Sequence, residues 1–145
     1  SWTVEAYQGS KEHGGYDAYL KRYSELVGSD NPNDFQKYYD KIYQSVVDRF
    51  ANHSVTIHRM PTEHWFDTFT EKLDWIYVDA SHSYDGCLND LRKSWNMIKQ
   101  GGYLLCDDYS EKKLDVKNAI TDFAKEKDLT IDNFYMDQVK FVKEF

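Results

Sequence analysis

Two short apolar runs in the middle of the chain each end at acidic residues, and this pattern constrains the fold most. The run 75–78 is followed by Asp79, and the run 102–106 is followed by Asp107 and Asp108. In an open α/β sheet, parallel strands are apolar along their length, and ligands bind outside their carboxyl ends. The pattern therefore predicts two parallel strands whose carboxylates meet at one edge of a sheet.

The segment between these runs has the spacing of an amphipathic helix. Apolar residues recur there at intervals of three or four positions: Leu88, Leu91, Trp95 and Ile98. This spacing places them on one face of a helix. Residues 75–106 are therefore predicted to form a strand, a crossover helix and a second strand, the unit from which parallel α/β sheets are built.

Further elements are predicted on both sides of this unit. Alternating or β-prone runs predict strands at 2–7, 55–60, 129–135 and 139–142. Helical spacing predicts helices at 16–26, 35–50, 63–69 and 116–127. Asp34 is expected to cap the second of these helices. No repeat or linker interrupts the chain, so its 145 residues are expected to form a single domain.

Composition narrows the choice of partners. The formal net charge of -7 would repel a polyphosphate backbone, so nucleic acid is not an expected partner. No apolar run approaches the ~20 residues of a membrane span, and no signal sequence is recognisable. Cys87 and Cys106 lack the spacing of a disulfide framework or a zinc site. We expect reduced thiols in a cytoplasmic protein whose partner is a small molecule.

Two motifs carry a resemblance to a known family. Residues 79–84 have the pattern Asp-x-x-His-x-Tyr, and residues 99–109 combine a Lys-x-Gly-Gly turn, an apolar strand and an acidic pair. Both resemble the class I S-adenosylmethionine-dependent methyltransferases, in the branch with this His pattern after the fourth strand. The resemblance implies a Rossmann-like α/β fold with a mixed, mostly parallel sheet and a C-terminal antiparallel hairpin. Residues 1–145 would supply its second to seventh strands.

The glycine-rich loop that opens this fold is the part that the resemblance leaves out. No Gly-x-Gly occurs in the chain, whose paired glycines are Gly14 with Gly15 and Gly101 with Gly102. We therefore expect an N-terminally truncated piece of the fold, without the central first strand. Such a piece is expected to bind S-adenosylmethionine weakly or not at all, and the gap in its sheet would favour a homo-oligomer.

The resemblance also assigns catalytic and metal-binding residues. Asp79, Asp107 and Asp108 would bind Mg²⁺, because carboxylate oxygens are the ligands that hard divalent cations prefer. His82 would act with Asp79 in catalysis, as the general base that takes the proton of an acceptor hydroxyl. The alternative is that these carboxylates only cap strand ends and the helices that follow them.

The cofactor would lie against the ends of two earlier strands. Glu5 would accept hydrogen bonds from the ribose diol, as an acidic residue does in nucleotide-binding α/β folds. Met60, Pro61 and Thr62 would lie against the adenine ring, and Asp79 would border the same crevice. An exposed charge at Glu5 and an ordinary turn at 60–62 are the simpler alternatives.

Three functions are consistent with the sequence. The resemblance favours methyl transfer from S-adenosylmethionine to an oxygen of a small molecule, assisted by a metal, an activity that a truncated piece could lack. A second hypothesis is a noncatalytic scaffold or association module. A third is a metal-dependent hydrolase that uses Asp79, His82 and Asp108 around a divalent ion and water.

Overall fold

The computed structural model of the chain describes residue 21 and residues 24–144. The predicted strand at 2–7, with Glu5, lies outside the described residues, and so does most of the predicted helix at 16–26. Contacts within the chain divide it into two compact units, 1–57 and 58–145. Each unit is described by itself, and the single domain expected from the sequence stays a prediction.

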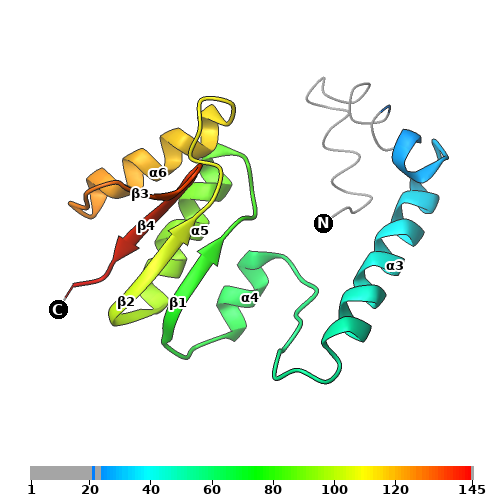
Figure 1. The fold of residues 1–145 in the computed structure, drawn as a ribbon, viewed down its shortest axis with the longest axis horizontal. Helices are drawn as coiled ribbons and strands as arrows, with labels where there is room; N and C mark the ends of the chain where they lie inside the picture. Colours follow the sequence, from blue (N-terminus) through cyan, green and yellow to red (C-terminus); the bar gives the residue numbers. More distant parts are fainter. Residues whose placement is uncertain (1–20, 22–23, 145) are drawn as a thin grey trace. The chain divides into compact units, whose positions relative to one another are not determined.

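The first unit contains helix α3, Pro32–Phe50 (Figure 1). Its N-cap is Asn31, whose side chain accepts a 3.0 Å hydrogen bond from the backbone N–H of Asn33. The prediction of Asp34 as the cap is wrong, because Pro32 opens the helix and proline suits the first helical position. Asp34 lies in the first turn, where it accepts a hydrogen bond from Ser29 and forms an ion pair with Lys37.

The second unit contains the sheet (Figure 1). Its elements are α4 (Thr62–Thr68), β1 (Leu73–Val78), α5 (Tyr84–Met97), β2 (Ile98–Cys106), α6 (Leu114–Glu126), β3 (Asp132–Tyr135) and β4 (Gln138–Val142). The strand order is β1-β2-β4-β3. Strands β1 and β2 are parallel, and β4 runs antiparallel to both β2 and β3. The predicted strand–helix–strand unit and the terminal hairpin are therefore confirmed.

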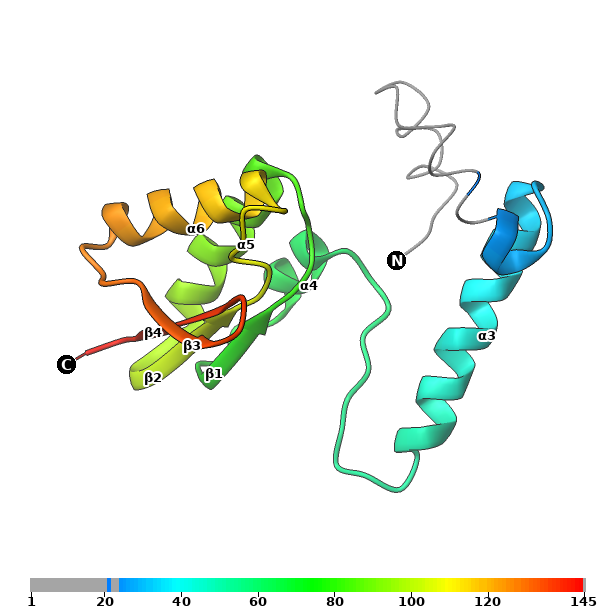
Figure 2. The ribbon, with the colours of Figure 1, turned by 45° about the horizontal axis from the view of Figure 1, so that its top comes forward.

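Helices α5 and α6 lie side by side on one face of this sheet (Figure 2). Alternate residues of the strands point into the core beneath them, which is why Leu104, Cys106, Val139 and Phe141 are buried. On the helices the core residues include Leu88, Leu91, Ile120 and Phe123. The strand residues that alternate with the buried ones point to the opposite face of the sheet, where Trp75 and Tyr77 are exposed.

The glycine pair at the start of β2 has a geometric explanation. Gly101 has φ +79°, a left-handed conformation that side chains with a Cβ rarely adopt. A Cβ on Gly102 would lie 2.5 Å from the backbone oxygen of Asp74. The pairing of β1 and β2 is irregular between Leu73 and Trp75, directly across from these glycines. Gly102 thus permits β2 to approach β1 closely at this irregularity, and Gly101 permits the left-handed backbone beside it.

One predicted strand does not form. Residues 55–60 alternate in hydrophobicity, yet they adopt neither strand nor helix. A strand needs a hydrogen-bonded neighbour, and none of the described strands pairs with this segment. No helix in the described part of the chain has the length and apolarity needed to cross a membrane.

Candidate functional site

The candidate site lies at the carboxyl ends of β1 and β2. Asp79 follows β1 directly, and the N–H of Asp107 donates a 3.0 Å hydrogen bond to the carbonyl of Val78, which extends the parallel ladder by one residue. The two strand ends border a small pocket of about 10 Å³, which is room for about one water molecule. Its polar rim is formed by Asp79, His82 and the acidic pair, and Cys87 and Cys106 are among the residues that line it.

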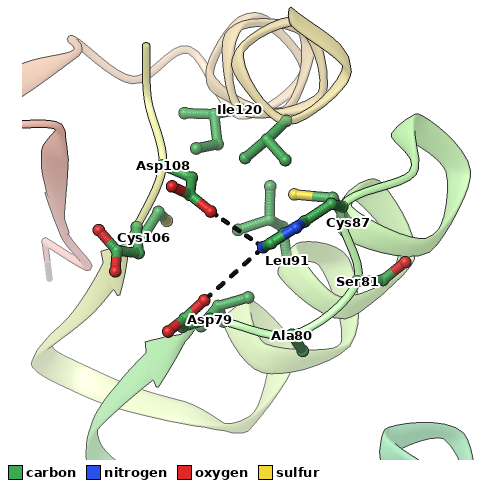
Figure 3. Close-up of a pocket in the computed structure, with 12 residues that line it drawn as sticks. Asp79, Ala80, Ser81, Cys87, Leu91, Cys106, Asp108 and Ile120 are labelled. Carbon is green, nitrogen blue, oxygen red and sulfur yellow. Dashed lines mark ion pairs between the residues drawn. The ribbon is translucent and has the colours of Figure 1, made fainter. Parts of the chain in front are cut away.

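His82 contacts two of the carboxylates, those of Asp79 and Asp108, which Figure 3 labels at the ends of the two strands. Its Nε2 is 2.9 Å from an oxygen of Asp108 and 3.9 Å from an oxygen of Asp79. The ligand atoms of these three residues all lie within 4.8 Å of one another. The structure thus brings together two of the three predicted metal-binding carboxylates and the predicted base.

The loop that carries His82 is fixed at both ends of its motif. Ser83 is the N-cap of α5, and its side chain accepts a 3.2 Å hydrogen bond from the N–H of Gly86. The hydroxyl of Tyr84 donates a 3.0 Å hydrogen bond to Asp122 on α6. The Asp-x-x-His-x-Tyr pattern therefore supplies the site residues Asp79 and His82 and, in Tyr84, a link between α5 and α6. Ser83, between His82 and Tyr84, caps α5.

The two acidic residues after β2 point to different partners. Asp108 has φ +62°, a left-handed conformation that Asp tolerates better than most residues. This conformation interrupts the strand at the residue that meets His82. Asp107, in contrast, accepts a 2.7 Å hydrogen bond from the hydroxyl of Tyr77 on β1. The adjacent carboxylates therefore take part in separate networks.

Tyr77 links Asp107 to the hairpin as well. The Tyr77 oxygen accepts a 3.0 Å hydrogen bond from the side-chain amide of Gln138 at the start of β4. The hydrogen bond to Asp107, together with burial and nearby carboxylates, raises the pKa of Tyr77 to about 12. The same hydrogen bond lowers the pKa of Asp107. Asp107 is therefore held as a carboxylate by its neighbours on β1 and β4.

A lysine that the sequence did not indicate completes the surroundings of His82. Lys113, just before α6, places its ammonium 3.0 Å from Nδ1 of His82 and 3.7 Å from Asp108. The sequence pattern did not predict three of the residues around the site, namely Tyr77, Gln138 and Lys113. Tyr77 lies two residues before Asp79 and so on the same side of the strand, which was a usable signal. Lys113 carried no such signal, because a loop brings it back to the site.

The donor set fits a hard or borderline divalent cation. The two carboxylates suit Mg²⁺ or Mn²⁺, which accept oxygen ligands and keep several waters, and the imidazole beside them suits a borderline ion better than Mg²⁺. The thiols beneath are unsuited, because burial raises the pKa of Cys87 to about 11 and that of Cys106 still further. A neutral buried thiol is a poor metal ligand. Both cysteines are free, as expected from the sequence.

The predicted adenine contacts, residues 60–62, are not among the residues that line this pocket. Met60 is exposed, Pro61 is the N-cap of α4, and the hydroxyl of Thr62 donates a 2.9 Å hydrogen bond to Asp90 on α5. The pocket beside Asp79 is far smaller than the several hundred Å³ of a typical cofactor site.

A family model described as a methyltransferase domain matches residues 2–109, about three quarters of the chain. The chain belongs to this methyltransferase family. The matched region ends one residue after Asp108 and so includes all of Asp79, His82 and the acidic pair. Membership in a methyltransferase family implies S-adenosylmethionine as the methyl donor.

Two further proteins are similar to parts of the chain. The solved structure of the O-methyltransferase NovP aligns with a TM-score of 0.53 at 19% sequence identity, over 70% of this chain and 45% of that one. This likeness shows the methyltransferase fold. An uncharacterised protein of Acanthamoeba polyphaga mimivirus is 31% identical over 45 residues, which are 31% of this chain and 20% of that protein. The chain thus spans less than half the length of either relative.

Proposed function

We propose that the protein transfers the methyl group of S-adenosylmethionine to an oxygen of a small molecule, with a divalent cation bound by Asp79 and Asp108. The observation that supports the proposal best is the convergence of Asp79, His82 and Asp108 at the carboxyl ends of two parallel strands. It occurs in a chain of the methyltransferase family. The small-molecule acceptor agrees with the negative net charge and with the O-methyltransferase fold neighbour.

Asp79 and Asp108 are the stronger candidates for cation ligands. Their carboxylates are about half and about one-third exposed, and each has an oxygen within 4 Å of Nε2 of His82. Asp107, which the sequence also predicted as a ligand, has one oxygen occupied by the Tyr77 hydroxyl. It could contribute its other oxygen. When bound, a cation supplies positive charge that lowers the pKa of an acceptor hydroxyl.

His82 would take the hydroxyl proton in this reaction. An ammonium group can only donate, so Lys113 occupies the lone pair of Nδ1, and Nε2 carries the proton that faces Asp108. Lys113 therefore has to leave Nδ1 before that nitrogen can accept a proton. When bound, S-adenosylmethionine would supply the methyl carbon to which the acceptor oxygen bonds as the carbon–sulfur bond breaks, and the electron pair of that bond would stay on sulfur. The protein mainly aligns the two reactants.

Calorimetric titration with Mn²⁺ and Mg²⁺ tests the cation. Asp79→Asn and Asp108→Asn should each weaken binding at least about tenfold, because each removes a charged oxygen ligand. Asp74→Asn is the matched control, since Asp74 is an exposed carboxylate on the same strand that pairs with Lys99. Unchanged binding in Asp79→Asn would show that these carboxylates are structural caps.

A separate experiment tests methyl transfer itself. The protein is incubated with S-adenosylmethionine and hydroxylated acceptors, and mass spectrometry measures the S-adenosylhomocysteine that forms.

Metal-dependent hydrolysis is a second candidate, favoured by one observation. The cluster that forms is Asp79, His82 and Asp108, the set that the sequence predicted for a hydrolase. Membership in the methyltransferase family favours methyl transfer over it. Cleavage of a chromogenic ester or phosphate with Mn²⁺ but without S-adenosylmethionine would favour hydrolysis. A cytoplasmic location, a homo-oligomer and a noncatalytic role stay predictions from the sequence.

A further inference from the structure

A second carboxylate network lies between α4 and α5. Asp90 on α5 is 4% exposed, and one of its oxygens accepts the 2.9 Å hydrogen bond from the hydroxyl of Thr62. Its other oxygen, Oδ2, is buried without a hydrogen-bond partner in the described part of the chain. Burial raises the pKa of Asp90. A buried carboxylate with an unsatisfied oxygen is unusual in native proteins and calls for an explanation.

We propose that Asp90 is a positioning residue, which fixes the first turn of α4 and with it the cofactor-binding segment 60–62. This inference rests on the proposed methyl transfer from S-adenosylmethionine and on the sequence-based expectation that residues 60–62 lie against the adenine ring. Asp90 acts through Thr62 and does not touch the cofactor. It would therefore determine how well the cofactor binds and leave the chemistry at Asp79 and His82 unaltered.

Helix α4 has little else to hold it in place. It has only seven residues, none of them buried, and its N-cap residue Pro61 makes no side-chain capping hydrogen bond. A helix this short is unstable on its own. Its contacts with α5 include the Thr62–Asp90 hydrogen bond and Lys93, whose ammonium lies 5.6 Å from the centre of the Phe66 ring. Among these contacts, the hydrogen bond is the directional one at residue 62.

Stability alone does not account for Asp90. Removing a carboxylate from water without full hydrogen bonding is unfavourable, and replacing a buried polar pair by apolar groups of similar shape is often neutral or stabilising. The charged neighbours partly cancel, since Glu63 raises the pKa of Asp90 and Lys93 lowers it. The advantage that the pair provides is orientation, because a hydrogen bond fixes the direction between α4 and α5 and an apolar contact does not.

The experiment titrates the chain with S-adenosylhomocysteine and follows the backbone amide signals by NMR, which detects weak binding. Asp90→Leu and Thr62→Val remove the hydrogen bond, whereas Asp90→Asn and Thr62→Ser retain it. Ser94→Ala is the matched control, because Ser94 is the other buried polar side chain on α5 without a partner in the described residues. Thermal unfolding of every variant is measured in parallel.

The proposal expects Asp90→Leu and Thr62→Val to weaken binding about five- to tenfold, the effect of about one hydrogen bond. Their midpoints of unfolding should equal or exceed that of the wild type. Asp90→Asn and Ser94→Ala should bind as the wild type does, and Thr62→Ser, which keeps the hydroxyl, should bind more tightly than Thr62→Val. Since Thr62 is exposed, Thr62→Val decides the matter even if Asp90→Leu does not fold.

Three results would overturn the proposal. Equal binding by Thr62→Val and the wild type would show that residues 60–62 are placed by other contacts. Weaker binding that follows lower stability across all variants would make Asp90 a structural residue. No response of the wild type at any concentration would reject the proposed cofactor, and this inference with it. The wild-type titration thus separates failure of the function from failure of the inference.

Discussion

The hydroxyl of Tyr77 donates a 2.7 Å hydrogen bond to Asp107 across the parallel pair of strands β1 and β2. This contact separates Asp107 from Asp108, its neighbour in the chain, which contacts His82. One carboxylate of the pair is therefore bound to the strands, and the other belongs to the candidate cation site. The predictions below follow from this division and from the geometry around it.

The first prediction concerns the ionisation of Tyr77. Its pKa is raised from about 10 to about 12, so the folded protein favours the protonated phenol. The resulting stabilisation is complete below pH 10, the ordinary pKa of tyrosine, and is lost as the pH rises from 10 to 12. Tyr77→Phe should remove one late-titrating group from the tyrosinate absorbance. Identical titrations of variant and wild type would contradict the hydrogen bond.

The second prediction distinguishes the two acidic residues after β2. Asp108→Asn should weaken Mn²⁺ binding at least about tenfold, whereas Asp107→Asn should leave it within about threefold, because the Tyr77 hydroxyl already occupies Asp107. Calorimetric titration of both variants provides the measurement. Equal losses would instead support all three carboxylates as ligands, as the sequence predicted.

The third prediction concerns Gly86, at the start of α5. A Cβ at this position would lie 2.3 Å from the hydroxyl oxygen of Ser81 and 2.8 Å from its Cβ, so the loop that carries His82 must shift. Gly86→Ala should weaken cation binding although alanine favours a helix by about 1 kcal/mol over glycine. Calorimetry and circular dichroism measure the two effects.

The fourth prediction concerns the affinity for S-adenosylmethionine. This 145-residue chain has no Gly-x-Gly loop, so it should bind the cofactor weakly, with a dissociation constant well above micromolar. Loss of several hydrogen bonds of about 1 kcal/mol each lowers affinity by orders of magnitude. Isothermal titration measures it. A micromolar dissociation constant would be evidence that another segment, such as residues 11–15, replaces the glycine loop.

The sequence by itself determined the elements whose signals are local. The spacing of Leu88, Leu91 and Trp95 defined the crossover helix, and the apolar runs before Asp79 and Asp107 defined the parallel strands. Side-chain periodicity follows from backbone geometry alone, so it is readable without contacts. The connection by a helix required parallel strands, and parallel strands place their final carboxylates at one edge. This is why Asp79 and Asp108 could be paired in advance.

Only the tertiary structure decided which groups meet at that edge and elsewhere. The left-handed conformation of Asp108, the return of Lys113 to His82 and the hydrogen bond from Tyr77 to Asp107 depend on loops and neighbouring strands. The absence of a strand at 55–60 and the hydrogen bond between Thr62 and Asp90 also depend on which segments of the chain lie beside each other. Directional contacts between residues far apart in sequence leave no periodic signal, because their partners are fixed by packing.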